Sequence, residues 1–184
     1  MPTLAELLAR LEQAGEAPAR PPLASWQPPL SGDIDIRIAA DGRWYHEGGE
    51  IRRQPLVRLF ASILRREGPD HVLVTPVEKW RIRVDDLPFT AHAVTRLEHN
   101  GVPQLLFTLN TGEDLVAGRD HPLVVDEMAD GSPQPRLHVR DDLWARVDRA
   151  SFYQLAEWGE PRQGEGGDEL CVSSGGAIFT LGRI

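Results

Sequence analysis

The chain has 184 residues, which suits one medium-sized domain or two small ones and excludes a large barrel fold. Its composition is 41% hydrophobic and 26% charged, so disorder of the whole chain is excluded. With 28 acidic and 20 basic side chains the net charge is −8, which argues against a protein that coats nucleic acid. Only one basic residue, Lys79, is lysine; all the others are arginine.

Cysteine content and apolar runs indicate where the protein works. The single cysteine, Cys171, cannot form a disulfide within the chain, which is typical of a reducing compartment. The N-terminus lacks the basic start and apolar core of a signal peptide, and no apolar run approaches the roughly 18 residues of a membrane span. We therefore expect a cytoplasmic protein that does not enter a membrane.

Residues 1–30 predict an amphipathic helix followed by a proline-rich connector. Leucines recur at helical spacing within residues 3–13, and five prolines fall between residues 14 and 30. So short a helix is marginal alone, so its leucine face must pack on something. It packs either on its own domain or on a protein partner, and the pattern leaves both open.

Residues 31–88 predict a first α+β unit. The strict alternation of charge and isoleucine from Asp33 to Ile38 is typical of a half-buried strand. Pro55 suits the first turn of a helix, on which Arg65 is expected to face water. The expected elements are strands at 33–38, 43–46, 71–75 and 77–84, and a helix from Pro55 that ends at Gly68-Pro69.

Residues 89–184 predict a second α+β unit. Asn100-Gly101 fits the two positive-φ positions of a type I′ hairpin turn. A helix is expected at 151–158, with Asp148 or Ser151 as its N-cap, followed by a loop at 161–168. The expected strands are 90–99, 102–109, 121–126, 136–140, 169–173 and 177–181.

An internal echo links the two units. The segment Ile51-x-Arg53-x-Pro55 aligns with Val147-x-Arg149-x-Ser151 at an offset of 96 residues, and each leads into a predicted helix and a strand pair. The order of elements predicts an internal duplication. We therefore expect two similar small α+β units, with mostly antiparallel sheets and one helix each.

Several segments carry a resemblance to a known family. They are the strand pair at 34–51, the helix L-V-R-L-F-A-S-I-L-R-R-E (56–67), L-V-T-P-V-E-K-W (73–80), F-T-L-N-T-G-E-D (107–114), D-H-P-L (120–123) and S-S-G-G-A-I-F-T-L-G (173–182). From about Trp26 to Gly182 the chain resembles a largely proteobacterial family named only "domain of unknown function 1285". The family has no established activity. The resemblance implies a duplicated α+β architecture with a pleckstrin-homology-like C-terminal half. It also implies a site between the halves for a nucleotide-like molecule in a signalling role.

Lys79 stands in the most family-specific run, T-P-V-E-K-W (75–80). A lysine can meet one phosphate oxygen as a compact charge, which distinguishes it from the arginines used elsewhere. Strand alternation places Lys79, Arg81 and Arg83 on one face, where they either meet an anion or pair with Asp33 and Asp35 across strands. Glu78 is the neighbouring candidate, but adjacent strand residues point to opposite faces.

The other candidate ligand-binding residues are aromatic, basic or amide side chains near predicted strand and helix ends. Trp44 and His46 could stack a purine ring, although such clusters more often belong to a core. Arg53 and Arg149 could clamp an anion, or hold their loops by bonding backbone carbonyls. Asn110 and His121 are the candidates in the second half.

Catalytic and metal motifs are missing from the sequence. No Walker loop, G-x-S-x-G elbow or H-E-x-x-H motif occurs, and the six histidines have no metal-ligand spacing. The glycines of Ser173-Ser174-Gly175-Gly176 fit either a hairpin turn or an anion-binding loop. We expect no cofactor and no metal, no catalytic residue and no bulk nucleic-acid binding.

Three functions are weighed on these grounds. The first is a cytoplasmic ligand-binding or signalling module that holds a nucleotide-like anion between its two halves. The second is a protein-interaction adaptor that uses the barrel-like C-terminal half and the leucine face of residues 4–11. The third, least favoured, is a hydrolase acting on a phosphorylated metabolite.

Overall fold

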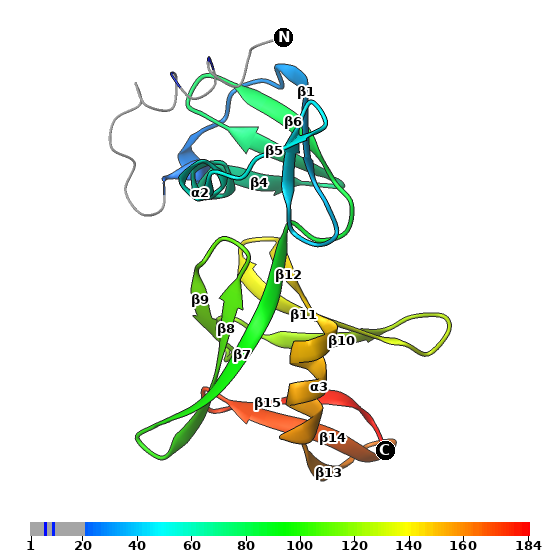
Figure 1. The fold of residues 1–184 in the computed structure, drawn as a ribbon. Helices are drawn as coiled ribbons and strands as arrows, with labels where there is room; N and C mark the ends of the chain where they lie inside the picture. Colours follow the sequence, from blue (N-terminus) through cyan, green and yellow to red (C-terminus); the bar gives the residue numbers. More distant parts are fainter. Residues whose placement is uncertain (1–5, 7–8, 10–20) are drawn as a thin grey trace. The chain divides into compact units, whose positions relative to one another are not determined.

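The computed structural model describes Glu6, Ala9 and residues 21–184 (Figure 1). Contacts divide the chain into Met1–Asp86 and Leu87–Ile184, which we call the N-terminal unit and the C-terminal unit. Within residues 21–184 each unit is α+β, with one α-helix and mostly antiparallel strands. The helix expected at 3–13 lies, apart from Glu6 and Ala9, outside the described residues.

The N-terminal unit is built on one six-stranded sheet. Its strand order is β3-β2-β1-β6-β5-β4, and β1 pairs with β6 in parallel while the other neighbours are antiparallel. The elements are η1 (Leu23–Ser25), β1 (Gly32–Ile38), β2 (Trp44–His46), β3 (Gly49–Glu50), α2 (Gln54–Ser62), β4 (Leu64–Glu67), β5 (Asp70–Val74) and β6 (Lys79–Val84).

The two faces of this sheet differ, as the alternation in β1 predicts. Ile34, Ile36 and Ile38 are at most 5% exposed, and helix α2 contributes Phe60, which stacks on Trp44 at 6.0 Å between ring centroids. The opposite face carries charged side chains from the three strands β1, β4 and β6. This charged face includes Asp33, Asp35, Arg65, Glu67, Lys79, Arg81 and Arg83. The buried face and the charged face therefore offer different surroundings to residues that are neighbours in sequence.

Helix α2 is shorter than the sequence pattern predicts. It ends at Ser62, and Leu64–Glu67 forms β4, which pairs with β5 through the turn at Gly68-Pro69. Strand pairing with β5 satisfies these backbone groups and overrides the helical spacing of the leucines. Arg65, expected to face water, has a side chain that is only 16% exposed.

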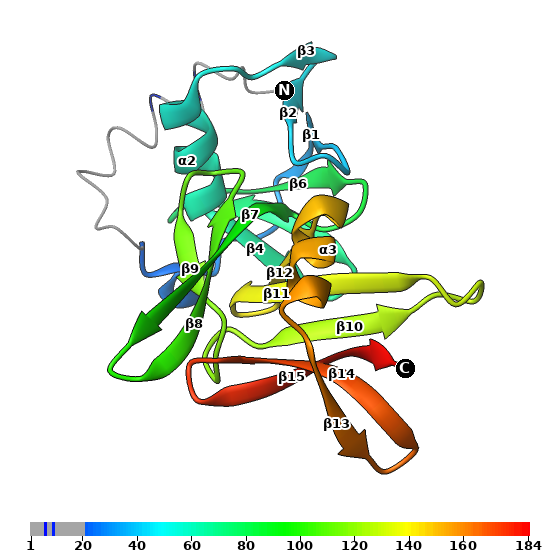
Figure 2. The ribbon, with the colours of Figure 1, turned by 60° about the horizontal axis from the view of Figure 1, so that its bottom comes forward.

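The C-terminal unit contains two sheets and one helix. A six-stranded sheet has the order β10-β11-β12-β7-β8-β9, and a three-stranded sheet has the order β13-β14-β15, which Figure 2 shows beside β10. The elements are β7 (Phe89–His99), β8 (Val102–Leu109), β9 (Asp114–Val116), β10 (Leu123–Glu127), β11 (Pro133–Arg140), β12 (Leu143–Val147), α3 (Arg149–Glu157), β13 (Glu160–Gly164), β14 (Gly167–Ser174) and β15 (Ala177–Arg183).

In this unit the sequence predicts the turns and the helix cap better than it predicts the short strands. Asn100 and Gly101 have φ of 51° and 75°, as the predicted hairpin requires. Asp148 is the N-cap of α3, since its carboxylate accepts a hydrogen bond from the Ser151 N–H. Three strands were not predicted, namely β9, β12 and β13. Strand β13 occupies part of the expected 161–168 loop, because it pairs with β14.

The same series of elements occurs in both units. In each, a helix is followed by three antiparallel strands, β4-β5-β6 after α2 and β13-β14-β15 after α3. The sheets differ, because β6 also pairs with β1 whereas β13-β14-β15 form a sheet of their own. The duplication and the pleckstrin-homology-like form of the C-terminal unit stay predictions. No helix among the described residues is long and apolar enough to cross a bilayer.

Candidate functional site

Lys79 is an ion-pair partner on the charged face of the N-terminal unit. Its Nζ atom lies 2.9 Å from Oε2 and 3.2 Å from Oε1 of Glu67 on β4, so the two side chains reach each other across β5. The Lys79 side chain is 15% exposed and that of Glu67 is 35% exposed. A carboxylate thus already occupies the place at the ammonium group that an anionic ligand would need.

Glu67 is shared between two cations. Arg65 Nη2 donates to Glu67 Oε1, and Arg65 Nη1 donates to the backbone carbonyls of Leu23 at 3.0 Å and Trp26 at 2.8 Å. The hydrogen bond from Lys79 lowers the pKa of Glu67 below its ordinary value; partial burial opposes this, and Arg65 adds to the lowering. The cluster therefore ties the segment 21–26 to the sheet.

The other cations of the charged face are paired across strands. Arg81 Nη1 lies 3.0 Å from Asp33 Oδ1, and Arg83 Nη2 lies 3.0 Å from Asp35 Oδ1. These pairs join β6 to β1, which is the structural alternative considered for the basic stripe. Exposed pairs of this kind contribute little to stability, typically below about 1 kcal/mol.

Glu78 belongs to the tight turn between β5 and β6. The Thr75 N–H donates to the Glu78 carbonyl at 2.8 Å, and the Glu78 N–H donates to Thr75 Oγ1 at 3.0 Å. The Glu78 carboxylate accepts a hydrogen bond from Trp80 Nε1 at 3.4 Å. The T-P-V-E-K run is thus a turn that hydrogen bonds between Thr75 and Glu78 close, and Val77 within it is 70% exposed.

Trp44 and His46 do not share a site with Lys79. Trp44 is 1% exposed, pairs with Ile38 at the far end of β1 and points to the buried face. His46 pairs with Ile36 on the same face, whereas Lys79 lies on the charged face beside the start of β1. Along β1, Ile38 beside Trp44 is six residues from Gly32, about 20 Å at the usual rise per residue, and Ile36 beside His46 is four residues from it, about 13 Å.

Arg53 and Arg149 lie at the starts of the two helices. Arg53 is the N-cap residue of α2, and its carbonyl accepts from the Leu56 and Val57 N–H groups. Arg149 is the first residue of α3. Both are exposed, in different units. The two alternatives for Arg53 and Arg149, an anion clamp or a hold on their own loops, both stay predictions.

Asn110 and His121 serve the backbone of the C-terminal unit. Asn110 Oδ1 accepts from the Thr90 N–H at 3.0 Å, and the Asn110 N–H donates to the Thr90 carbonyl at 2.9 Å. His121 Nδ1 lies 3.0 Å from the His138 carbonyl, and the two imidazoles stack at 6.2 Å. Asn110 and His121 thus lie in the segments between β8 and β9 and between β9 and β10, and both bind the backbone.

The Ser-Ser-Gly-Gly turn joins the two sheets of the C-terminal unit. Buried Ser174 donates its hydroxyl to the Ala117 carbonyl at 2.7 Å and accepts from the Leu105 N–H at 2.8 Å. Gly175 has φ of 58°, and a Cβ there would lie 2.9 Å from the Ala117 oxygen. Close approach of two backbones explains this glycine without a bound anion.

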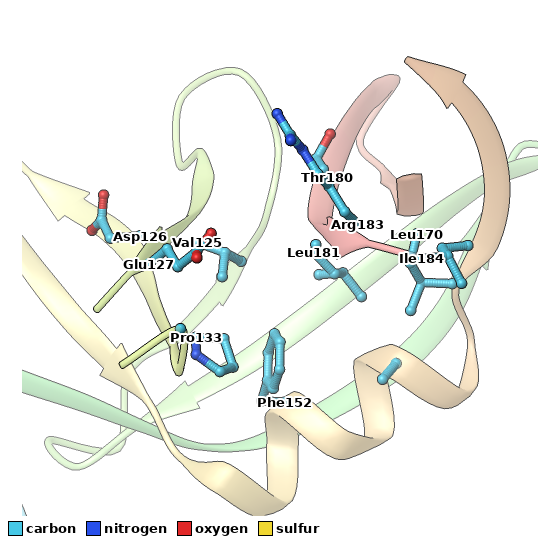
Figure 3. A pocket seen from close by; sticks show the side chains of 13 residues that line it. Val125, Asp126, Glu127, Pro133, Phe152, Leu170, Thr180, Leu181, Arg183 and Ile184 are labelled. Carbon is cyan, nitrogen blue, oxygen red and sulfur yellow. The ribbon is translucent and has the colours of Figure 1, made fainter. Parts of the chain in front are cut away.

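A cavity of about 660 Å³ lies in the C-terminal unit (Figure 3). Its walls come from the β10–β11 hairpin, helix α3 and the strands β14 and β15. Apolar side chains form its inner wall, and Figure 3 shows Arg183 and Thr180 at one side of the opening and Asp126 and Glu127 at another. The apolar lining residues are Val125, Pro133, Phe152, Ala156, Leu170, Leu181 and Ile184.

Family models match almost the whole described chain. The model for "Domain of unknown function (DUF1285), N-terminal domain" matches residues 21–87. The model for "Protein of unknown function (DUF1285), C-terminal domain" matches residues 88–181. The chain belongs to the DUF1285 family. The resemblance noted in the sequence is confirmed.

Two crystal structures of DUF1285 proteins are similar to this chain. One is from Silicibacter pomeroyi DSS-3, with 42% identity and a TM-score of 0.83, covering 97% of this chain and 95% of that one. The other is from Shewanella baltica OS155, with 26% identity and a TM-score of 0.52, covering 66% of this chain and 90% of that one. No curated protein matches the chain.

The cavity is the feature of this DUF1285 protein that sequence reasoning missed. Its lining residues come from three separated stretches, 125–133, 152–156 and 170–184, and none of the predicted site residues is among them. The sequence carries only apolar residues in each stretch, and no spacing along the chain joins the three stretches. Within the described residues no group of three or more His, Cys, Asp or Glu side chains is placed to hold a metal ion.

Proposed function

We propose that the chain is a binding module whose C-terminal unit takes an amphipathic small molecule with an apolar body and an anionic head. The cavity of about 660 Å³ carries this proposal. Ligand pockets in proteins commonly measure about 300–1,000 Å³, with apolar walls and a few polar groups that orient the ligand. The cavity has that size and that division of residues.

The inner wall suits the apolar body of such a ligand. Phe152 and Ala156 lie one turn apart on α3 and face the cavity together with Leu170 and Leu181 of the three-stranded sheet. Each methylene group of a ligand that is buried against these side chains contributes about 0.8 kcal/mol to the binding free energy. A chain of several methylene groups therefore gains affinity from the wall alone.

The rim suits an anionic head. Asp126 is paired with Arg136, whose Nε atom lies 2.6 Å from its Oδ2, so the charge of Asp126 is balanced. Arg183 stands at the opening, and a guanidinium group binds a carboxylate through two parallel hydrogen bonds. Glu127 at the same rim opposes an anion, so the head is expected beside Arg183.

Calorimetric titration with decanoate tests the proposal. Arg183→Gln is expected to weaken binding about tenfold, and Ala156→Phe, which places a phenyl ring in the cavity, is expected to weaken it as well. Glu127→Gln is expected to tighten binding, because it removes a repelling charge. Arg162→Gln on β13, outside the cavity lining, is the matched control and is expected to bind like the wild type. Absence of decanoate binding, or equal binding by all four variants, would contradict the proposal.

The nucleotide-like ligand implied by the family resemblance stays a prediction. A nucleotide phosphate at Lys79 would have to displace Glu67 from the ammonium group. The same calorimeter tests it with ATP and GMP. Nucleotide binding that is lost in Lys79→Met and kept in Arg183→Gln would favour that ligand over ours.

The remaining predictions from the sequence are proposals of the same kind. They are the signalling role, the cytoplasmic location, the duplication and the pleckstrin-homology-like form. The adaptor alternative depends on the barrel-like C-terminal half and on the leucine face of residues 4–11, whose leucines lie outside the described residues. The hydrolase alternative finds no support in the described geometry, because Glu78 and Lys79 have separate partners.

A further inference from the structure

Strand β7 has an edge that no described strand covers. It pairs with β8 along its length to His99, but on its other side β12 pairs only with residues 89–91. Figures 1 and 2 both show the tip of the β7–β8 hairpin extending away from α3. Residues 95–99 are all exposed. Such an edge is a template for a further strand.

The hairpin register says which backbone groups point outward. His99 and Val102 flank the two-residue Asn100-Gly101 turn, so they form a hydrogen-bonded pair. Hydrogen-bonded and non-hydrogen-bonded pairs alternate from there. Arg96 and Glu98 therefore direct their N–H and C=O groups away from β8, toward the uncovered edge, whereas Leu97 directs its own toward β8.

The side chains of this edge are complementary to themselves. Arg96 and Glu98 lie on one face of β7 at equal distances from Leu97. If a second copy of the strand runs antiparallel with Leu97 opposite Leu97, each Arg96 stands opposite a Glu98. Any register that places Arg96 opposite Arg96 brings like charges together, which is unfavourable.

Leu97 would add an apolar contact at the centre of this strand pairing. Its side chain is 46% exposed, and Val102 on the paired strand is 37% exposed. Leu97 and Leu97 of a second copy would form a non-hydrogen-bonded pair, the kind in which opposite side chains come closest. Pairing would thus cover an apolar side chain that is exposed in the single chain.

We propose that β7 is a self-association edge, where two copies of this chain pair antiparallel about a two-fold axis at Leu97. The paired residues are 95–99 of each copy, with one hydrogen-bonded Arg96–Glu98 pair on each side of the axis. The inference is independent of the ligand proposed for the cavity. The partner is a second copy because the strand supplies both members of each charge pair.

Cysteine trapping tests the axis. Opposite residues of a non-hydrogen-bonded pair are about 4.5 Å apart at Cα, which a disulfide spans. Leu97→Cys is expected to form a disulfide-linked dimer under mild oxidation. Thr95→Cys, on the same face, is the matched control, because its two copies would lie about 14 Å apart. The native Cys171 is buried and does not compete. Equal rates of cross-linking at positions 95 and 97 would overturn the proposal.

Charge exchange tests the register. Sedimentation of the wild type over a range of concentrations is expected to show a reversible dimer. Arg96→Glu or Glu98→Arg alone places like charges opposite each other twice and is expected to raise the dissociation constant about tenfold. The double exchange is expected to restore it. A wild type that stays monomeric, or single variants that dimerise like the wild type, would contradict the proposed pairing. Association of this edge only with a different protein would also overturn the proposed pairing.

Discussion

Nζ of Lys79 lies 2.9 Å from Oε2 of Glu67, so the only lysine of the chain is a partner in an ion pair on the charged face of the N-terminal unit. Arg65 donates to Oε1 of the same carboxylate and also to the carbonyls of Leu23 and Trp26. Glu67 already binds one guanidinium group, that of Arg65. A compact ammonium group fits beside it more easily than a second planar guanidinium group would. The composition therefore singles out a structural contact of the sheet.

The Lys79–Glu67 pair is expected to stabilise the N-terminal unit by about 1 kcal/mol, because both side chains are partly shielded from water. Lys79→Met keeps the chain length and removes the charge. Urea unfolding of Lys79→Met, Glu67→Gln and the double variant gives the coupling energy. A coupling indistinguishable from zero would contradict this role.

The lowered pKa of Glu67 predicts that the free energy of unfolding depends on pH. The pKa of Glu67 is lowered on folding, chiefly by the hydrogen bond from Lys79. Its contribution is therefore present above the ordinary value of 4.5 and is lost as the pH falls through the lower folded value. Unfolding measured from pH 7 to pH 3 should show wild type and Glu67→Gln converging only below about pH 4.5. A gap that stays constant to pH 3 would contradict the assignment.

Arg65 is expected to hold the segment 21–26 against the sheet. Arg65→Met removes both bonds to the Leu23 and Trp26 carbonyls and should speed amide hydrogen exchange in this segment about tenfold. Arg66→Met is the matched control, since Arg66 is exposed and bonds the Gly68 carbonyl. Equal exchange in the two variants would show that the prolines and Leu23 alone hold the segment.

Ser174 is expected to be the costliest hydroxyl to remove from the C-terminal unit. Ser174→Ala leaves the Leu105 N–H and the Ala117 carbonyl without this partner in a buried place, at about 2 kcal/mol. Ser173→Ala on the same strand should cost less than about 0.5 kcal/mol. Thermal unfolding of both variants compares them directly, and similar losses would rule out the special role of Ser174.

Much of the fold follows from patterns within short stretches. The alternation from Asp33 to Ile38 predicts β1, and Asn100-Gly101 predicts the β7–β8 hairpin, because each depends only on near neighbours in sequence. The end of α2 was missed, since β4 exists only through pairing with β5. Strand β13 was missed for the same reason, because its composition is that of a loop and β14 supplies its partners.

The candidate site was harder to predict than the fold. Lys79 could be singled out by composition, but its partner Glu67 lies two strands away in the sheet and no spacing in the sequence joins them. Trp44 is a core residue because β2 directs its side chain toward Phe60. The sequence predicts this strand but not which of its two faces is buried. The cavity combines separated stretches, so only the assembled C-terminal unit could reveal it.

The most direct test of the proposed function is methyl NMR of the full chain during titration with decanoate. The account predicts that the methyl resonances of Leu170, Leu181 and Val125, which line the cavity, shift together, while those of Val72 and Val74 beside Lys79 stay unchanged. Shifts confined to Val72 and Val74, or no shift at any methyl group, would contradict a ligand site in the C-terminal unit.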